Sequence, residues 1–233
     1  MLTIHAAELL LPGDREPVPG GAVLVDGDRI ARIGPYEDVA AAHPAARVRR
    51  WPGLLTPGLL NRHGTALLEH TYFPDDPFEL DELGSEPITG AALADLAPGE
   101  SRRGNSARRC TQKLLARGVV AVAARLTTPA VRTAVHRAGL EVVPMPDAEG
   151  PAALDPFADA EPADAFRAPL AVDGPARFAV FAAPDAVALA ARGGRDVYRH
   201  RHRRATAASP RLAPLGGVSA CRGHRFLRSS SRP

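Results

Sequence analysis

Three short apolar segments alternate with two helical segments between residues 54 and 143, and this alternation limits the chain to few architectures. Each helical segment ends at a glycine, Gly118 or Gly139, which is suited to close a helix. Strands that alternate with helices pair in parallel, because a crossover helix carries the chain back to the starting end of the sheet. The sequence therefore predicts a parallel βαβ segment, with its elements at residues 54–64 (LLTPGLLNRHG, ending at its polar residues), 101–117, 119–123, 129–138 and 140–143.

The first 55 residues predict a small β-sheet unit. Apolar and polar residues alternate from Leu2 to His5, and Ala22 to Val25 is an apolar run. Asp26-Gly27-Asp28 predicts a tight hairpin turn, because glycine accepts positive φ. A short helix and a further strand are predicted at residues 37–42 and 47–51.

The remaining segments are more irregular. The acidic segment 72–100 predicts a solvated loop with one short helix, and it lacks the residue spacing of a calcium-binding loop. The Pro-, Ala- and Asp-rich segment 144–168 predicts a linker. A β-hairpin is expected from Leu170–Val172 and Phe178–Phe181, followed by a short helix at Pro184–Ala191.

The net charge of +3 averages two unlike parts of the chain. Residues 192–233 hold eleven arginines and one acidic residue, whereas residues 1–191 hold 18 basic and 25 acidic residues. A basic tail of this kind can neutralise phosphates, so nucleic-acid binding is one alternative. The tail contains only Tyr198 and Phe226 as aromatic residues, too few to stack bases along a strand. We therefore expect a disordered tail, and we favour a small-molecule or protein partner over nucleic acid.

Composition excludes several classes of protein. Cys110 and Cys221 provide neither a disulfide framework nor a Cys-x-x-Cys metal site, which favours a cytoplasmic location. No leader-like segment begins the chain and no apolar run is long enough to span a bilayer, so no membrane partner is expected. Cys110 lies among arginines that could lower the pKa of its thiol, but we favour a small residue on a packed helix face.

The most informative stretch for function is Leu55 to His70, LTPGLLNRHGTALLEH, in which a buried strand ends near His63. His63 is followed by Gly64 and Thr65, so no His-x-His pair is present. Glu69 and His70 fall on neighbouring faces of the predicted helix, not on one face as in a His-x-x-x-His metal motif.

Three patches resemble the amidohydrolase superfamily, specifically imidazolonepropionase and aminodeoxyfutalosine deaminase-like proteins. They are GAVLVDGDRIARIGP, WPGLLTPGLLNRHG and PLAVDGPARFAVF. The resemblance implies a composite β-sandwich built from both chain ends, with a barrel inserted between them. The expected fold class is accordingly α+β: a small β-sandwich of this composite type, a short, truncated βα insert, and a disordered C-terminal tail.

The resemblance also implies a hydrolase of C–N bonds in which zinc or iron activates water. Two histidines from the first barrel strand would be among the ligands. His63 matches the first, while Thr65 stands at the second, and Asn61 stands where an aspartate is common. About 115 residues separate His63 from Phe178, whereas a full barrel takes roughly 200 to 250 residues. His63 and His70 are the only metal-ligand candidates, no catalytic residue is assigned, and no cofactor is expected.

We interpret the chain as an imidazolonepropionase-like composite-domain protein that is non-catalytic alone and has a structural, ligand-binding or partner-binding role. A divergent metal-dependent hydrolase, with zinc or iron at His63, is the alternative from another class, and tail-mediated nucleic-acid binding is a further one. The expected parts are an N-terminal sandwich part, a truncated barrel-like segment, a linker, returning sandwich strands and a basic tail, at residues 1–55, 56–143, 144–168, 169–191 and 192–233.

The basic tail is also compatible with a slipped reading frame. Codons for residues 196–206, read one nucleotide later, permit an alternating apolar strand of the kind that the resemblance expects at this point. We therefore hypothesise a frame slip near residues 193–196. The coding DNA tests it, since an early stop codon inside the shifted strand would exclude the hypothesis.

Overall fold

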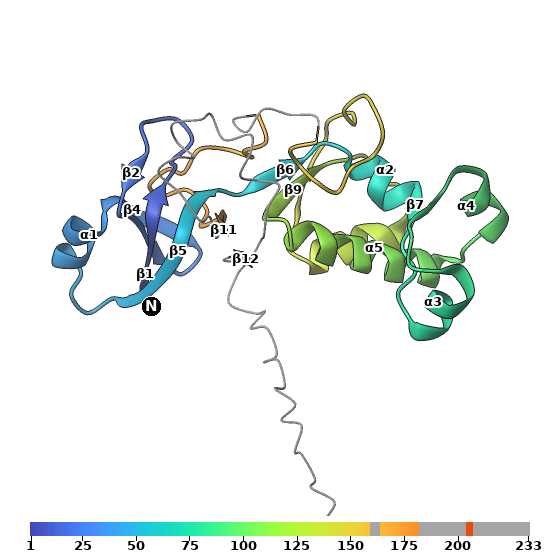
Figure 1. The fold of residues 1–233 in the computed structure, drawn as a ribbon, viewed down its shortest axis with the longest axis horizontal. Helices are drawn as coiled ribbons and strands as arrows, with labels where there is room; N and C mark the ends of the chain where they lie inside the picture. Colours follow the sequence, from blue (N-terminus) through green and yellow to red (C-terminus); the bar gives the residue numbers. More distant parts are fainter. Residues whose placement is uncertain (159–163, 182–203, 207–233) are drawn as a thin grey trace, which may run out of the picture.

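A computed structural model describes residues 1–158, 164–181 and 204–206 of the chain (Figure 1). The described residues form a mixed α/β structure with six helices and three sheets. The predicted helix at 184–191 lies outside them, as does the predicted tail apart from residues 204–206. No helix among them combines the length and the apolar character that crossing a membrane requires.

The largest sheet has strand order β12-β11-β5-β1-β3-β4, and a short strand, β2, pairs with the end of β1. Its strands are β1 (Leu2–Leu10), β2 (Val18–Pro19), β3 (Gly21–Asp26), β4 (Arg29–Pro35), β5 (Arg47–Pro57), β11 (Phe178–Phe181) and β12 (Arg204–Thr206). The predicted hairpin is confirmed: β3 and β4 pair antiparallel around Gly27. β1 and β5 pair in parallel at the centre of the sheet.

The C-terminal strand β11 joins this sheet by pairing antiparallel with the second half of β5. The predicted hairpin partner of β11, Leu170–Val172, forms no strand. Residues 173–176 instead bond to the start of β4, where the N–H of Asp173 donates to the carbonyl of Ile30 at 2.8 Å. Neighbouring segments in sequence therefore contact different strands of one sheet.

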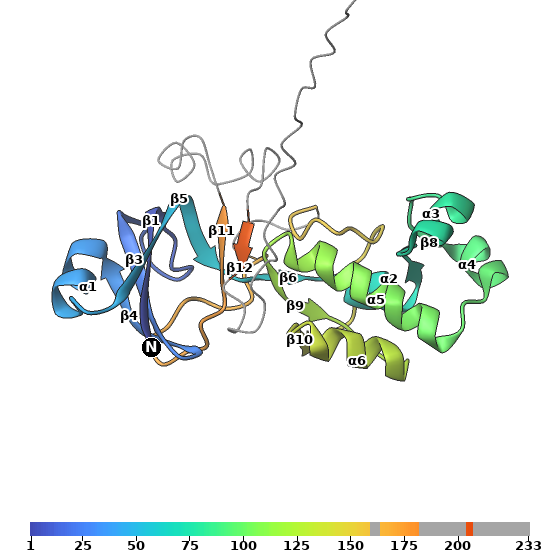
Figure 2. The same cartoon turned by 90° about the horizontal axis from the view of Figure 1, so that it is seen from below.

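Apolar side chains pack on both faces of the large sheet. Helix α1 (Tyr36–Ala42) buries Val39 on one face against Ile4 and Leu24. On the other face, Phe178 packs with Val23 and other apolar side chains. Figure 2 shows α1 on the outer side of the sheet, away from the rest of the molecule.

The second sheet confirms the predicted parallel βαβ segment. Its strand order is β10-β9-β6, all parallel, and its strands are β6 (Leu59–Asn61), β9 (Val119–Ala123) and β10 (Glu141–Val143). Helices α5 (Glu100–Leu115) and α6 (Pro129–Arg137) pack against it. They bury Cys110 and Leu114 on α5 and Val131 and Val135 on α6, as the spacing of these apolar residues requires.

The segment predicted as a loop, 72–100, contains more structure than expected. After α2 (Gly64–Glu69) and β7 (Thr71–Tyr72), it forms α3 (Pro77–Leu83), β8 (Ile88–Thr89) and α4 (Gly90–Leu96). Asp76 caps α3, accepting from the N–H of Glu79 at 2.9 Å. No residue of α3 or α4 is buried, so these helices form an arm that projects from the end of the molecule (Figures 1 and 2).

Parts of the predicted linker pair with the edge of β6 that faces away from β9. The N–H of Leu60 donates to the carbonyl of Ala165 at 2.8 Å, and the N–H of Arg167 donates to the carbonyl of Gly58 at 2.9 Å. Arg167 also forms an ion pair of 2.6 Å with Glu141 at the start of β10. The backbone groups of β6 are thus paired on both sides, with β9 and with residues 165–167.

Candidate functional site

The candidate site lies at the carboxyl ends of β6, β9 and β10. These ends lie at one edge of the sheet because the three strands run parallel, and ligand sites of parallel α/β folds gather at this edge. Asn61 ends β6 and His63 follows it, Arg125 follows β9, and Asp147 follows β10. The chain therefore brings polar residues from three separate segments to one place.

His63 is buried, with 4% of its surface exposed, and it immediately precedes α2. Its N–H donates to Oδ1 of Asn61 at 2.9 Å, and its carbonyl accepts from the N–H of Leu67 at 2.9 Å. Asn61 is fully buried, and its Nδ2 donates to the carbonyl of Ala153 at 2.8 Å. These bonds fix the turn from β6 into α2.

Thr65, which stands where the resemblance expects a second histidine, is held by two other segments. Its N–H donates to Oδ1 of Asp147 at 3.0 Å, and the N–H of Ala66 donates to Oδ2 of Asp147 at 2.6 Å. The Thr65 hydroxyl accepts from the N–H of Arg125 at 3.0 Å. The Asp147 carboxylate satisfies N–H groups that the first turn of a helix leaves without intrahelical partners. Thr65 thus links α2 to the segments that follow β9 and β10.

The donor set does not fit a catalytic metal, which takes about three protein ligands. Within the described part of the chain, no group of three or more His, Cys, Asp or Glu residues could hold a metal ion. His70 caps the other end of α2 and is exposed, about 10 Å from His63 along the helix axis. The structure does not bring the two candidate ligands together.

Comparison with known proteins finds a family model that matches part of the N-terminal region. Residues 21–46 match the family model of the imidazolonepropionase-like composite domain of bacteria. Imidazolonepropionases of Yersinia pestis (strain Pestoides F) and Yersinia pseudotuberculosis (serotype O:1b, strain IP 31758) are 34% and 41% identical to this chain over 85 residues. The predicted resemblance is confirmed. Each match covers 36% of this chain, which spans only 19% of the length of these curated relatives.

Two solved structures of enzymes match part of this chain at low sequence identity. An adenosine deaminase from Xanthomonas campestris with bound zinc has a TM-score of 0.47 and 17% identity, covering 60% of this chain and 33% of its own. For the Aspergillus niger ochratoxinase the TM-score is 0.44 and the identity 22%, with 60% of this chain and 30% of that chain covered.

Glu69 has a structural contact that the sequence did not indicate. Its Oε1 accepts from the N–H groups of Thr127 and Thr128 at 2.7 and 3.0 Å, and its Oε2 accepts from the Thr128 hydroxyl at 2.6 Å. Burial alone would raise the pKa of Glu69, but these bonds and the nearby His70 outweigh it and lower the pKa. Thr128 and Pro129 are recognisable as a helix start, but nothing in the sequence identifies Glu69 as the residue that caps α6.

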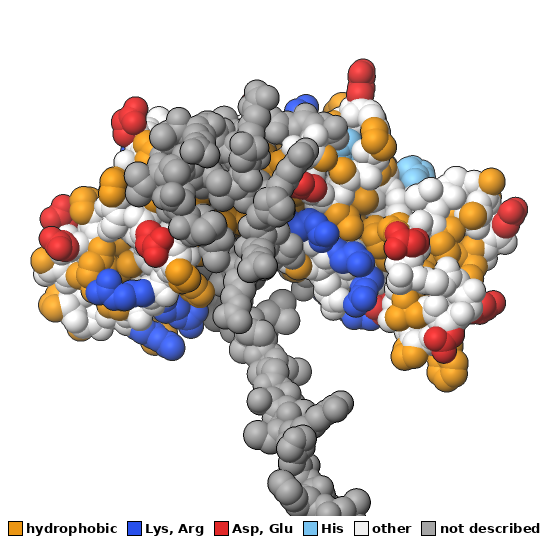
Figure 3. Space-filling view, viewed as in Figure 1, with side chains coloured by type: hydrophobic (Ala, Val, Ile, Leu, Met, Phe, Trp, Pro, Cys, Tyr) orange, Lys and Arg blue, Asp and Glu red, His pale blue; other side chains and the backbone are white. Residues whose placement is uncertain are grey.

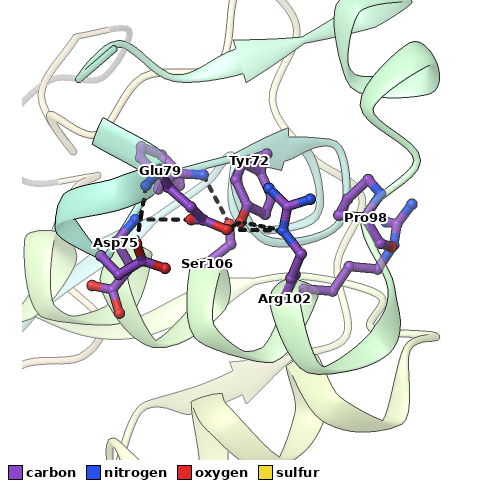
Figure 4. Close-up of polar contacts among 9 residues, drawn as sticks. Tyr72, Asp75, Glu79, Pro98, Arg102 and Ser106 are labelled. Carbon is purple, nitrogen blue, oxygen red and sulfur yellow. Dashed lines mark hydrogen bonds and ion pairs between the residues drawn. The ribbon is translucent and has the colours of Figure 1, made fainter. Parts of the chain in front are cut away.

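A second network anchors the arm to α5 (Figure 4). The Tyr72 hydroxyl donates to Oε1 of Glu79 at 2.6 Å, and Nε of Arg102 donates to the same oxygen at 2.8 Å. Burial and the bond to Glu79 raise the pKa of Tyr72 to about 12, so the phenol stays protonated. Asp75 pairs with Arg108 next to this network. These groups satisfy one another and hold α3 in place.

Cys110 is fully buried on the packed face of α5, as we favoured from the sequence. Burial raises the pKa of its thiol to about 12 despite the nearby charges of Lys113 and Arg117. The alternative, an arginine-activated thiol of low pKa, is therefore wrong. Cys110 contributes to the packing of α5 on the sheet.

Replacing Asp147 by asparagine should lower the free energy of unfolding by about 1 to 2 kcal/mol, because an amide nitrogen then faces one of the two N–H donors of α2. Urea denaturation of the full chain measures the change. Glu149→Gln is the matched control, since Glu149 is exposed in the same segment. If the two substitutions lower the free energy of unfolding equally, the Asp147 carboxylate does not stabilise the start of α2.

Proposed function

We propose that this chain is an imidazolonepropionase-like composite-domain protein that does not catalyse C–N hydrolysis alone, and that it acts through a structural or partner-binding role. The observation that carries the proposal is Thr65 in the second-histidine position, bonded to Asp147 and to the backbone of Arg125. A hydrolase of this type would need that position for a metal ligand. Here it is used for hydrogen bonds between chain segments.

The way in which segment 147–153 crosses the strand ends supports the same proposal. Besides the Asp147 contacts, the N–H of Ala148 donates to the carbonyl of Arg62 at 2.8 Å, and the carbonyl of Ala153 accepts from the Asn61 amide. This segment therefore lies against the edge at which parallel α/β folds place their active sites. A substrate would have to displace it to reach His63.

The proposed organisation follows the predicted division of the chain. Residues 1–55 and 169–191 would form the composite β-sandwich, which the pairing of β11 with β5 supports. Residues 56–143 would be a barrel-like segment limited to three parallel strands, and 144–168 the connection back to the sandwich. Residues 192–233 would be the basic tail. We also propose a cytoplasmic location, on the cysteine content given above.

Metal content and imidazolonepropionase activity of the purified full chain test this proposal. We expect less than about 0.1 zinc or iron per chain, no activity, and the same values for His63→Ala and for His136→Ala, a control on the exposed face of α6. About one metal per chain, lost in His63→Ala and retained in His136→Ala, would instead establish the divergent hydrolase.

A further inference from the structure

Two neighbouring parts of the chain carry opposite charge. Residues 75–96, which include α3, β8 and α4, contain seven acidic residues and no lysine or arginine. Residues 100–140, which include α5 and α6, contain nine lysines and arginines and one acidic residue. Figure 3 shows a band of basic side chains in the region of α5, beside acidic and apolar side chains of the arm. We call these two regions the acidic arm and the basic helix face.

The acidic arm exposes a large apolar side chain. Phe78 is 85% exposed, and no residue of α3 or α4 is buried. The arm is nevertheless held in place, because Glu79 on α3 bonds to Tyr72 and Arg102. An exposed aromatic side chain on an anchored helix, with carboxylates near it in sequence, is suited to contact a surface that carries basic side chains.

Only part of this charge is neutralised within one copy. Arg102, Arg108 and Arg109 form the ion pairs with Glu79 and Asp75. Six other basic residues have no acidic partner among the residues that the structure describes, namely Arg103, Lys113, Arg117, Arg125, Arg132 and Arg137. In the arm, the exposed carboxylates without a basic partner are those of Asp76, Asp81, Glu82, Glu86 and Asp95.

We propose that a second copy of this chain is the partner, with the acidic arm of each copy on the basic helix face of the other. The arm and helices α5 and α6 lie in the same half of the molecule, with the arm beyond the helices (Figure 2). A two-fold symmetric interface needs one patch that complements itself, and an acidic arm beside a basic face meets that requirement. Phe78 would lie near the centre of each contact, with the charges around it. This dimer rests on the proposed function, because a second copy of the chain would be the partner in the proposed partner-binding role.

Sedimentation velocity of the full chain over a concentration series is the first test. We expect a monomer–dimer equilibrium that weakens as ionic strength rises from about 50 to about 500 mM, because screening acts on exposed charges. Phe78→Ala should weaken dimerisation about tenfold or more, whereas Val172→Ala, at a side chain 52% exposed outside both regions, should have little effect. A monomer under all these conditions would overturn the dimer and leave the metal test of the proposed function unaffected.

Charge-reversal variants test whether the acidic arm and the basic helix face are the surfaces in contact. One variant carries Asp81→Lys with Glu82→Lys, and the other carries Arg132→Glu with Arg137→Glu. Each alone should fail to dimerise, because arm and face then have the same sign of charge. An equimolar mixture should form one-to-one pairs, since both contacts are again between opposite charges. Contact between the arm and the basic tail would respond to the arm variant only, without recovery on mixing, and this result would overturn the proposed interface.

Discussion

Replacing Glu69 by alanine should lower the free energy of unfolding by about 3 kcal/mol. The carboxylate is 7% exposed and accepts three hydrogen bonds, two of them from the N–H groups of Thr127 and Thr128 at the start of α6. Alanine leaves both N–H groups without their partner and removes the contact between α2 and α6. Hydrogen bonds to a charged group are among the stronger ones, and a buried donor left unpaired adds its desolvation penalty.

Urea denaturation of the full chain measures this loss, with Glu69→Gln and Glu86→Ala as companions. Glutamine keeps one acceptor oxygen, so its loss should be about half as large. Glu86 is exposed in the arm and should change stability by less than about 0.5 kcal/mol. If Glu69→Ala unfolds at the same urea concentration as Glu86→Ala, the Glu69 carboxylate is not holding α6.

The acidity of Glu69 determines the pH at which this contribution is lost. Its pKa is lowered in the folded state, because the hydrogen bonds outweigh burial. The unfolded chain therefore binds the proton more readily, and the stability that Glu69 contributes is present above its unfolded pKa of 4.5. It is lost as the pH falls below 4.5 and through the folded pKa. The difference between wild type and Glu69→Gln should shrink in that acid range.

Local sequence patterns predicted where the helices and strands lie better than they predicted which strands pair with each other. β9 begins and ends as predicted, and α6 starts at Pro129, because apolar spacing and a proline at the first helical position are local signals. The hairpin proposed for 170–181 is wrong, since residues 173–176 bond to β4 and β11 bonds to β5. Contacts over more than a hundred residues leave no trace in a short window of sequence.

In the candidate site, too, local features were predictable from the sequence and long-range contacts were not. His63 at the end of a buried strand was predicted from the sequence, and the resemblance drew attention to Thr65, where it expects a second histidine. The carboxylate that bonds to the backbone of Thr65 comes from Asp147, 82 residues further on, in a segment whose composition indicated only a linker. The cap of α6 likewise comes from Glu69, 59 residues before Thr128. Both contacts depend on where the chain returns, which the three-dimensional fold decides.

Acid should weaken this protein through His5, and Trp51 should report the change. His5 lies on β1 with 5% of its surface exposed, and its Nδ1 accepts from the indole N–H of Trp51 at 3.2 Å. Its ring also contacts Phe178 on β11, with ring centroids 4.9 Å apart. Burial, with a smaller effect of the Arg49 charge, lowers the pKa of His5 from 6.5 to about 4. Protonation at Nδ1 would remove the acceptor for Trp51.

The sign of the pH effect follows from proton binding. Between pH 6.5 and about 4 the unfolded chain holds a proton on His5 that the folded chain does not, so the free energy of unfolding falls as the pH falls through this range. The total contribution is about 3 kcal/mol, of which about 2 kcal/mol should be lost between pH 8 and pH 5. Stability that His5 contributes is fully present only above its unfolded pKa.

Urea denaturation at pH 8 and pH 5, followed by fluorescence, measures the effect, since Trp51 is the single tryptophan of the chain. His5→Gln is the comparison, because glutamine offers an acceptor to Trp51 and does not titrate. The loss of stability from pH 8 to pH 5 should be about 2 kcal/mol smaller in His5→Gln than in wild type. Equal losses would show that other groups cause the acid sensitivity. A smaller loss in the variant would show that protonation of this buried histidine, which contacts Trp51 on β5 and Phe178 on β11, causes the acid sensitivity.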